Sequence, residues 1–346
     1  MLNKIIICVE PRIAIAGAAG VIGSLVRITL EQQGLAWVTG YDSDKEIVQI
    51  INNLGMQVVR DFNGQLQVHE TTLADHLEGL QKPIKYLIVS VKRTDTATVI
   101  KEAIPYLNKD SVIVLTQNGV DFFSEIPQEL MAKLPTKKIV VSTVALAGTK
   151  FPWQKVNEPN EFVRVTFGGN ELVMAPHPVL SKQPGGEVPA ADLNYLKEKL
   201  QGQYVKAQVV SPEEFMPIMH NKFVLNCAVN PLSAIFGQSI GEAAKDPLFE
   251  KLFRAVITET IFVLERNNMP VGKMKLIDMK KFMDPMLWDK LEAASGAIVT
   301  RNAFSKLIHG IANWVNKFIA HLLFGRLKTI SSTLFSSLAQ EIHFWR

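Results

Sequence analysis

The sequence contains few of the residues that build disulfide-stabilised or metal-binding proteins. Its 346 residues include two cysteines, Cys8 and Cys227, each in an apolar stretch without C-x-x-C spacing. Isolated cysteines of this kind are typical of reduced, buried thiols in a cytoplasmic protein. The seven histidines form no cluster with the spacing of metal ligands. We therefore expect a cytoplasmic protein without a disulfide framework or a bound metal.

Long apolar runs and blocks of like charge are also missing. No stretch approaches the roughly 18 apolar residues of a membrane span. The apolar run near the N-terminus is too short for a signal peptide and is interrupted by Glu10, Pro11 and Arg12. The 37 basic and 33 acidic residues are spread along the chain and give a net charge of +4. We therefore expect neither a membrane nor a nucleic acid as a partner.

The sequence does have a glycine-rich turn between an apolar run and a helix-like apolar pattern. Residues 13–26 read IAIAGAAGVIGSLV. A strand, a tight turn and a helix N-terminus in this order are typical of proteins that bind the pyrophosphate of a dinucleotide. Glycine permits the turn and lets the backbone approach the phosphates, and a strand–turn–helix without a ligand is the alternative. The residues expected to contact the cofactor are Gly17, Ala18, Ala19, Gly20, Val21, Ile22 and Gly23.

An acidic residue follows the next apolar run. Asp42 lies nineteen residues after Gly23, just beyond the apolar residues 35–39. A carboxylate at this point accepts hydrogen bonds from the ribose hydroxyls of NAD and repels the 2′-phosphate of NADP. We therefore expect NAD to be favoured, while Lys45 keeps NADP possible.

Apolar strands alternate with helical patterns over the first 200 residues. This alternation predicts a parallel sheet covered by helices on both faces. Residues 162–167 and 172–175 flank Gly168, Gly169 and Asn170, which predicts an antiparallel hairpin. The other strand candidates are 58–60, 66–68, 86–91, 111–116, 139–144 and 207–210.

The pattern becomes helical from Pro212 onward. The fold class is therefore α/β, with an N-terminal Rossmann-like domain over residues 1–206 and an all-helical domain over 207–346. The apolar residues 311–324 could belong to a core or to the surface of a homodimer. The helix candidates are 213–236, 239–243, 246–267, 287–295 and 300–324.

Polar residues follow two of the predicted strands. Lys92 lies just past residues 86–91, and Asn118 follows 111–116 within a Gln-Asn-Gly sequence. Open parallel sheets bind ligands at the carboxyl ends of their strands, so both side chains are candidates for a ligand site. A solvated lysine and a simple turn ahead of Gly119 are the alternatives.

A third polar group lies in the helical half. Lys222, Asn226 and Asn230 recur at i, i+4 and i+8, so they share one face of a helix whose other faces are apolar. Buried polar groups are costly unless they have partners. A cleft holding a polar ligand would supply these partners, and a hydrogen-bond network between helices is the alternative.

Together these segments resemble the ketopantoate reductase (2-dehydropantoate 2-reductase) family. Residues 222–235, KFVLNCAVNPLSAI, are similar to the family signature K-x-x-x-N-x-x-x-N-P-L-(S/T)-A-(I/L). The sequences VSVK at 89–92, QNG at 117–119 and SSTL at 331–334 resemble its other motifs. The resemblance implies an enzyme that reduces an α-keto acid to a 2-hydroxy acid with NADPH, in a cleft between a Rossmann domain and a helical domain.

The resemblance also implies residue roles. Lys222 would be the general acid, since a cationic donor both stabilises the charge that develops on the keto oxygen and delivers a proton. Lys92 and Asn118 would lie between nicotinamide and substrate. The residues implied to hold the substrate are Asn226, Asn230 and Ser332.

Two other functions stay open. Family members continue beyond the Ser-Ser motif to a glutamate, and Glu341 lies too close to Ser332 to match it. This departure favours a non-catalytic dinucleotide-binding paralogue. The spacing G-x-x-G-x-x-G also suits short-chain dehydrogenases and epimerases, whose Tyr-x-x-x-Lys pair would be Tyr195 and Lys199.

Overall fold

The structure is a computed structural model that describes residues 11–60, 66–75, 83–118, 126–151, 163–238 and 240–272. The chain divides into two units, the first ending at Phe223 and the second beginning at Val224. This division falls inside helix α6 (Pro212–Phe236). The domain boundary near residue 206 stays a prediction.

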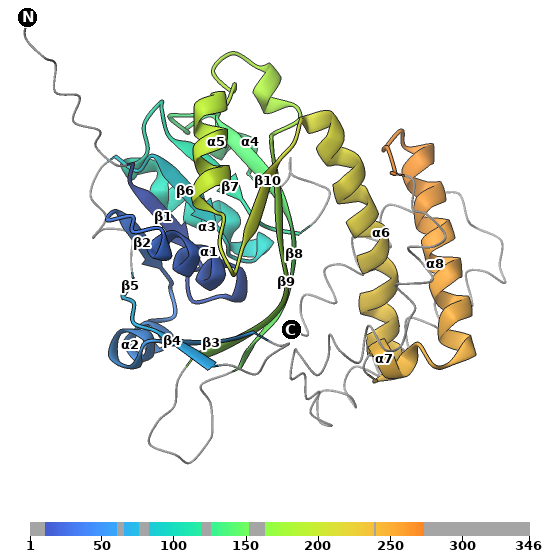
Figure 1. The fold of residues 1–346 in the computed structure, drawn as a ribbon. Helices are drawn as coiled ribbons and strands as arrows, with labels where there is room; N and C mark the ends of the chain where they lie inside the picture. The colour runs from blue at the N-terminus through green and yellow to red at the C-terminus, as the bar shows by residue number, and fades with distance from the viewer. Residues whose placement is uncertain are drawn as a thin grey trace, which may run out of the picture. The chain divides into compact units, whose positions relative to one another are not determined.

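The first unit is built around a ten-stranded sheet whose centre is parallel (Figure 1). Strand β1 lies in the middle, with β2 on one side and β6 on the other. Strand β6 pairs with β7 and β7 with β8, also in parallel. The parallel Rossmann-like sheet predicted from the sequence is therefore confirmed. The strands of this parallel part are β1 (Ile13–Ala16), β2 (Val38–Tyr41), β5 (Leu73–Ala74), β6 (Tyr86–Val89), β7 (Val112–Leu115) and β8 (Ile139–Phe151).

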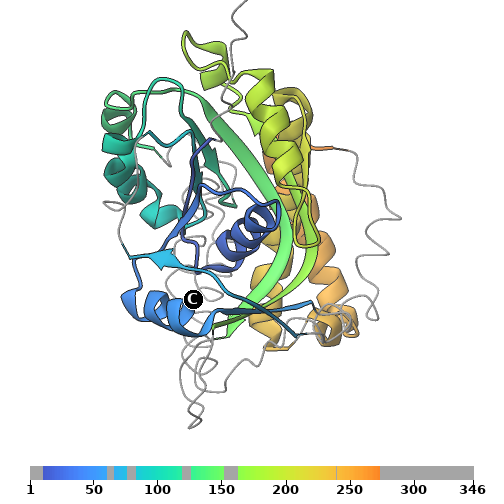
Figure 2. The same cartoon turned by 60° about the vertical axis from the view of Figure 1, so that its left-hand side comes forward.

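The predicted hairpin around residues 168–170 is wrong, because these residues lie inside one long strand, β9 (Val163–Pro176). This strand runs antiparallel to β8, with an irregularity between Ala145 and Ala147 opposite Gly169 and Asn170. Figures 1 and 2 show β8 and β9 as long, curved neighbours. Up to Phe167, β9 also pairs with β3 (Met56–Arg60), and from Glu171 it pairs with β10 (Lys206–Val209). Gly169 and Asn170 therefore lie at a bulge where β9 changes partner, and not in a turn.

Both faces of the sheet are buried. In β1, Ile13 and Ile15 join one apolar cluster together with α1, whereas Ala14 and Ala16 join the other together with α3. Alternate residues of a strand point to opposite faces, so a strand covered on both sides reads as a continuous apolar run. The helices of this unit before α6 are α1 (Val21–Gln32), α2 (Lys45–Leu54), α3 (Arg93–Ala103), α4 (Gln128–Met131) and α5 (Ala190–Lys199). Strand β4 (Leu66–His69) completes the sheet as the antiparallel partner of β3.

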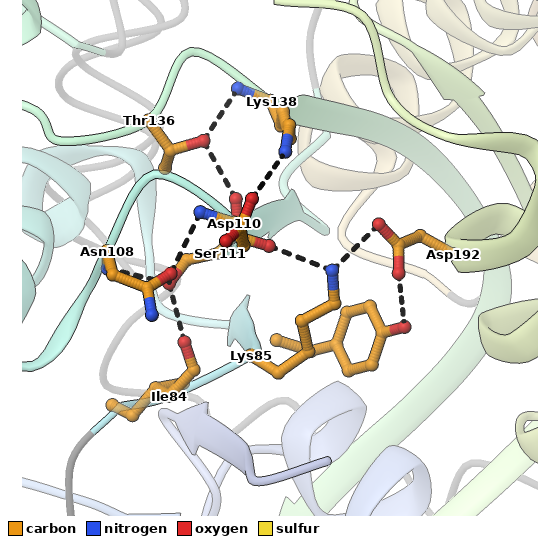
Figure 3. A network of polar contacts seen from close by, with 9 residues as sticks. Ile84, Lys85, Asn108, Asp110, Ser111, Thr136, Lys138 and Asp192 are labelled. Atoms are coloured by element: carbon orange, nitrogen blue, oxygen red, sulfur yellow. Dashed lines mark hydrogen bonds and ion pairs between the residues drawn. The ribbon is translucent and has the colours of Figure 1, made fainter.

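A network of polar contacts ties α5 to the edge of the sheet where β6 begins (Figure 3). The Lys85 ammonium lies 2.8 Å from the Asp192 carboxylate and donates to the Asp110 carbonyl at the same distance. The Tyr86 hydroxyl donates to the other Asp192 oxygen, also at 2.8 Å. Thr136 joins the network through a hydrogen bond to the Ser111 carbonyl. These contacts lie at the start of β6, whereas the glycine turn adjoins the other end of this strand.

The second unit, as far as residue 272, contains helices and no strand. It comprises the end of α6, α7 (Ile240–Ala243) and α8 (Pro247–Arg266). Phe249 packs on Phe253 and against the edge of Phe236. The predicted all-helical region is confirmed for these residues, and the candidate helices at 287–295 and 300–324 lie outside the described part of the chain. Among the described helices, none has both the length and the apolarity to cross a membrane.

Candidate active site

The glycine turn joins β1 to α1 in a conformation that side chains would disrupt. Gly17 has a φ of +77°, which favours glycine. A Cβ on Gly23 would lie 2.1 Å from the Gly17 carbonyl oxygen. Helix α1 can therefore pack this closely on the turn only with glycine at position 23. The amides of Gly17 and Ala18 both donate to the Tyr41 carbonyl at 2.9 Å, which fixes the turn on β2.

Helix α1 begins without a side-chain cap. Its N-cap residue is Gly20, and no acidic residue occupies its first turn. The first amides of a helix have no partner within the helix, and together with the helix dipole they attract an anion. A turn that packs closely at Gly17 and Gly23, next to an uncapped helix N-terminus, fits the pyrophosphate of a dinucleotide.

Asp42 follows β2 and is tied to the turn. One carboxylate oxygen accepts from the Ala19 amide at 3.1 Å and the other from the Asp44 amide at 3.1 Å. Each oxygen keeps a lone pair that can accept from a ribose hydroxyl. Lys45, the residue that would read a 2′-phosphate, pairs with Asp75 at 4.0 Å.

Lys222 is held at the carboxyl end of the sheet. Its ammonium donates to Asn118 Oδ1 at 2.7 Å and to the Val144 carbonyl. Burial lowers the pKa of Lys222 to about 8, because desolvation disfavours the ammonium. A group with this pKa can both hold a proton near neutral pH and release it during a reaction.

The other predicted residues of α6 extend along the same helix. Asn226 and Asn230 lie one and two turns beyond Lys222, on the same face, and all three are half-buried. Cys227 lies between the two asparagines in the sequence, and burial raises the pKa of its thiol to about 12, so the thiol stays protonated near neutral pH. Ser332 lies outside the described residues.

Lys92 takes a different place from Lys222. It is exposed and precedes α3 as its N-cap residue. Its carbonyl accepts from the Asp95 amide at 2.9 Å and from the Thr96 hydroxyl at 3.4 Å. The structure brings Lys222 and Asn118 into contact, and it places Lys92 at the end of the neighbouring strand.

The sequence analysis missed two residues that hold the end of β6. The Thr116 hydroxyl lies 3.0 Å from the Val89 carbonyl and 3.0 Å from Ser90 Oγ. Gln117 Nε2 donates to the carbonyls of Val89 at 3.1 Å and Val91 at 3.3 Å. The signal was available, because both polar residues directly follow a buried apolar strand and Gln117 opens the Gln-Asn-Gly sequence.

The pair Tyr195 and Lys199 lies away from the glycine turn. The Tyr195 ring stacks on Tyr86 with ring centroids 5.3 Å apart, and the Lys199 ammonium lies 5.9 Å from the centre of the Tyr195 ring. Tyr86 is the first residue of β6, whereas Gly17 lies against Ser90 and Val91, which follow the last residue of this strand. A catalytic Tyr–Lys pair would have to reach the cofactor edge, so this geometry argues against a short-chain dehydrogenase site.

Two family models match the chain. "Ketopantoate reductase PanE/ApbA" matches residues 13–168, and "Ketopantoate reductase PanE/ApbA C terminal" matches residues 214–303. The chain belongs to the ketopantoate reductase family. As a ketopantoate reductase family member it is an NAD(P)H-dependent oxidoreductase. The 2-dehydropantoate 2-reductase of Aquifex aeolicus (strain VF5) is 25% identical to it over 257 residues, which are 68% of this chain and 74% of the relative.

Several solved structures share the fold. A ternary structure of D-mandelate dehydrogenase with NADH and anilino(oxo)acetate has a TM-score of 0.59, at 18% identity and 79% coverage of each chain. A dimeric ketopantoate reductase from Staphylococcus aureus has a TM-score of 0.54 at 16% identity, covering 82% of this chain and 89% of that one. At these identities the structures support the fold alone.

Proposed function

We propose that this protein reduces an α-keto acid to a 2-hydroxy acid, with Lys222 as the general acid. The observation that carries the proposal is the way the ammonium is held. Of its three N–H donors, two have the acceptors Asn118 Oδ1 and the Val144 carbonyl. The third donor has no acceptor in the described part of the chain, so it is left for the keto oxygen of a substrate.

Lys222 would stabilise charge on the substrate, and the groups bonded to Lys222 would hold its ammonium in position. The nicotinamide cofactor, when bound, supplies the hydride. As the keto carbon is reduced, negative charge develops on its oxygen, and the Lys222 ammonium stabilises this charge and then delivers the proton. Asn118 and the Val144 carbonyl keep the ammonium in one place, so little reorganisation is needed during the reaction.

The amides further along α6 would bind the rest of the substrate. Asn226 and Asn230 share the face of Lys222, and each side-chain amide can donate to a carboxylate or accept from a hydroxyl. We assign both to substrate binding, together with Ser332 on the strength of the family resemblance alone. Lys92, at the end of β6, is assigned to the nicotinamide end of the cofactor, with Asn118.

The cofactor would lie on the glycine turn, with its adenosine ribose at Asp42. Residues 17–23 would hold the pyrophosphate, and the Asp42 carboxylate would accept from the ribose hydroxyls. Because Asp42 repels a 2′-phosphate and Lys45 is paired with Asp75, we propose NAD as the preferred cofactor. By analogy with the dimeric Staphylococcus aureus relative, we propose a homodimer.

The deciding experiment measures oxidation of NADH and NADPH with a panel of 2-keto acids. The panel contains ketopantoate, other branched 2-keto acids and phenylglyoxylate, the keto acid that corresponds to mandelate. Turnover of any member that depends on Lys222 supports the proposal. Dinucleotide binding without turnover of any member would contradict it and favour the non-catalytic paralogue.

A further inference from the structure

The end of β6 lies directly against the glycine turn. A Cβ on Gly17 would lie 2.8 Å from the Ser90 carbonyl oxygen and 3.0 Å from Val91 Cγ1. The Ser90 amide donates to the Ala16 carbonyl at 2.8 Å, so the last residue of β1 is joined to the same segment. Any movement of residues 90 and 91 therefore moves the wall against which the turn is packed.

Gln117 holds this segment from the next strand. Its Nε2 bridges the Val89 and Val91 carbonyls, which lie on either side of Ser90. The Val89 carbonyl has two further donors, the amide and the hydroxyl of Thr116. Within the described part of the chain, the Val91 carbonyl has Gln117 as its donor. Gln117 therefore acts chiefly on the position of Val91.

The amide at this position carries a cost to stability. Gln117 is 7% exposed, and its Oε1 is buried without a hydrogen-bond partner among the residues that the structure describes. A buried acceptor without a partner costs free energy, and an apolar side chain of the same length would avoid this cost. The benefit of the amide must lie in the bonds of its Nε2.

We propose that Gln117 is a positioning residue for the dinucleotide. It fixes Ser90 and Val91 against Gly17, so that the glycine turn is held in the shape that receives the pyrophosphate. Gln117 acts through the backbone of its neighbours and needs no contact of its own with the cofactor. The inference rests on the proposed function only in assuming that the dinucleotide lies on this turn.

The first test replaces the amide by an apolar side chain of similar length. Gln117→Met removes both bonds of Nε2 and the orphaned acceptor together. We expect the Kd for NADH, measured by fluorescence titration, to rise about 5- to 20-fold, the worth of one or two hydrogen bonds. The melting temperature should change little, because the loss of the donor to the Val91 carbonyl offsets the removal of the orphaned Oε1. The KM for the keto acid should change less than the Kd for NADH.

The matched control is Thr136→Val. Thr136 is also buried and also donates from its side chain to a carbonyl, that of Ser111, but it lies in the network at the start of β6 (Figure 3). We expect Thr136→Val to lower the melting temperature and to leave the Kd for NADH unchanged. Equal weakening of NADH binding by both variants would overturn the proposal.

The second test places a titratable group at residue 117. In Gln117→Glu, a protonated carboxyl can donate to one carbonyl, whereas a carboxylate would face two carbonyl oxygens and repel both. Burial raises the pKa of such a carboxyl, so we expect the Kd for NADH to rise from about pH 6 to about pH 8 in this variant and not in the wild type. A reversible dependence within one folded protein cannot come from misfolding.

These titrations separate the inference from the proposed function, because they measure binding without turnover. If the wild type binds NADH but reduces no keto acid, the proposed reaction fails while Gln117 is still judged by the Kd values. An unchanged Kd in Gln117→Met, or no pH dependence in Gln117→Glu, would overturn the role of Gln117. Wild-type protein that binds neither dinucleotide would overturn both.

Discussion

The Lys222 ammonium donates to Asn118 Oδ1 at 2.7 Å, although 104 residues separate the two. Asn118 follows β7 at the carboxyl edge of the sheet, and Lys222 comes from the middle of α6. The contact gives the ammonium one of its two oxygen acceptors, at a place where most of its surface is withdrawn from water. The same contact puts a proton donor at the edge where open parallel sheets bind ligands.

Removing this ammonium should stop the reaction and spare the cofactor site. We expect Lys222→Met to lower kcat by about 100- to 10,000-fold, the usual worth of general acid catalysis. The Kd for NADH should stay near that of the wild type, because the glycine turn is intact. Lys222→Arg should restore little, since a guanidinium holds its proton too firmly to donate it.

The control for this variant is Lys182→Met. Lys182 is exposed and pairs with Glu213, in the first turn of α6, at 3.3 Å. It therefore tests the loss of a lysine that contacts the same helix away from the site, and its kcat should match the wild type. A wild-type kcat in Lys222→Met, with only a shifted melting temperature, would remove Lys222 from the mechanism.

The reaction should lose its general acid as the pH rises. The pKa of Lys222 is lowered to about 8, so the ammonium predominates below this pH and the neutral amine above it. Reduction needs the ammonium, so kcat/KM for the keto acid should be level below about pH 8 and fall about tenfold per pH unit above it. Oxidation of the hydroxy acid needs the neutral amine and should rise across the same range.

The pH profile has its own check. If the descending limb belongs to Lys222, it should be missing from the residual activity of Lys222→Met, after correction for the pH dependence of cofactor binding. If the activity of the wild type and of Lys222→Met fell with the same midpoint pH, the ionisation would belong to a group other than Lys222.

Cofactor choice should depend on Asp42. The carboxylate accepts from the Ala19 amide, so it faces the same turn that would hold the pyrophosphate. We expect Asp42→Asn to weaken NADH binding by about 10-fold, because hydrogen bonds from ribose to a charged acceptor are replaced by neutral ones, and to improve NADPH binding. Fluorescence titration with both cofactors measures the change.

The ion pair between Lys45 and Asp75 offers a comparison with Asp42. Asp75→Asn releases Lys45 from its 4.0 Å ion pair while leaving the Asp42 carboxylate in place. If repulsion by Asp42 governs the choice, Asp75→Asn should improve NADPH binding less than Asp42→Asn. The opposite order would assign the choice to Lys45.

The features that the sequence predicted correctly are those that local patterns determine. The alternation of apolar runs and helical patterns identified the parallel sheet, because a strand buried on both faces must be apolar throughout. The positions of the glycines identified the turn, since a left-handed Gly17 and a Cβ-free Gly23 are steric requirements. The i, i+4, i+8 spacing placed Lys222, Asn226 and Asn230 on one helix face.

The features that the sequence left undetermined depend on contacts between distant segments. Gly168, Gly169 and Asn170 have the composition of a turn, but pairing with β8 makes them part of a continuous strand. The role of Gln117 required knowing that the Val89 and Val91 carbonyls lie beside it. In both cases the partner strand, and not the local sequence, decides the outcome.

The surroundings of Arg27 also depend on contacts between distant segments, and these contacts predict an unusual effect on the free energy of unfolding. It is fully buried on the apolar side of α1, with Nε 3.8 Å from the Glu31 carboxylate and Nη2 4.0 Å from Met56 Sδ. Its Nε and Nη1 make no hydrogen bond in the described part of the chain. Burial lowers the pKa of Arg27, which Glu31 opposes, so the folded protein bears the cost of a poorly compensated charge.

Replacing this guanidinium by an apolar side chain of similar length should therefore stabilise the fold. We expect Arg27→Met to raise the free energy of unfolding by about 1–3 kcal/mol, because the charge is removed while the space is still filled. Glu31 keeps a hydrogen bond from the Thr71 hydroxyl at 2.9 Å and is partly exposed, so it tolerates the loss of its partner.

Arg27→Ala is the contrasting variant, since it also removes the charge but leaves a cavity, and it should lower the free energy of unfolding by about 2–5 kcal/mol. Urea unfolding of both variants measures the two effects. A loss of stability in Arg27→Met as large as that in Arg27→Ala would show that the ion pair with Glu31 outweighs the cost of burying the charge.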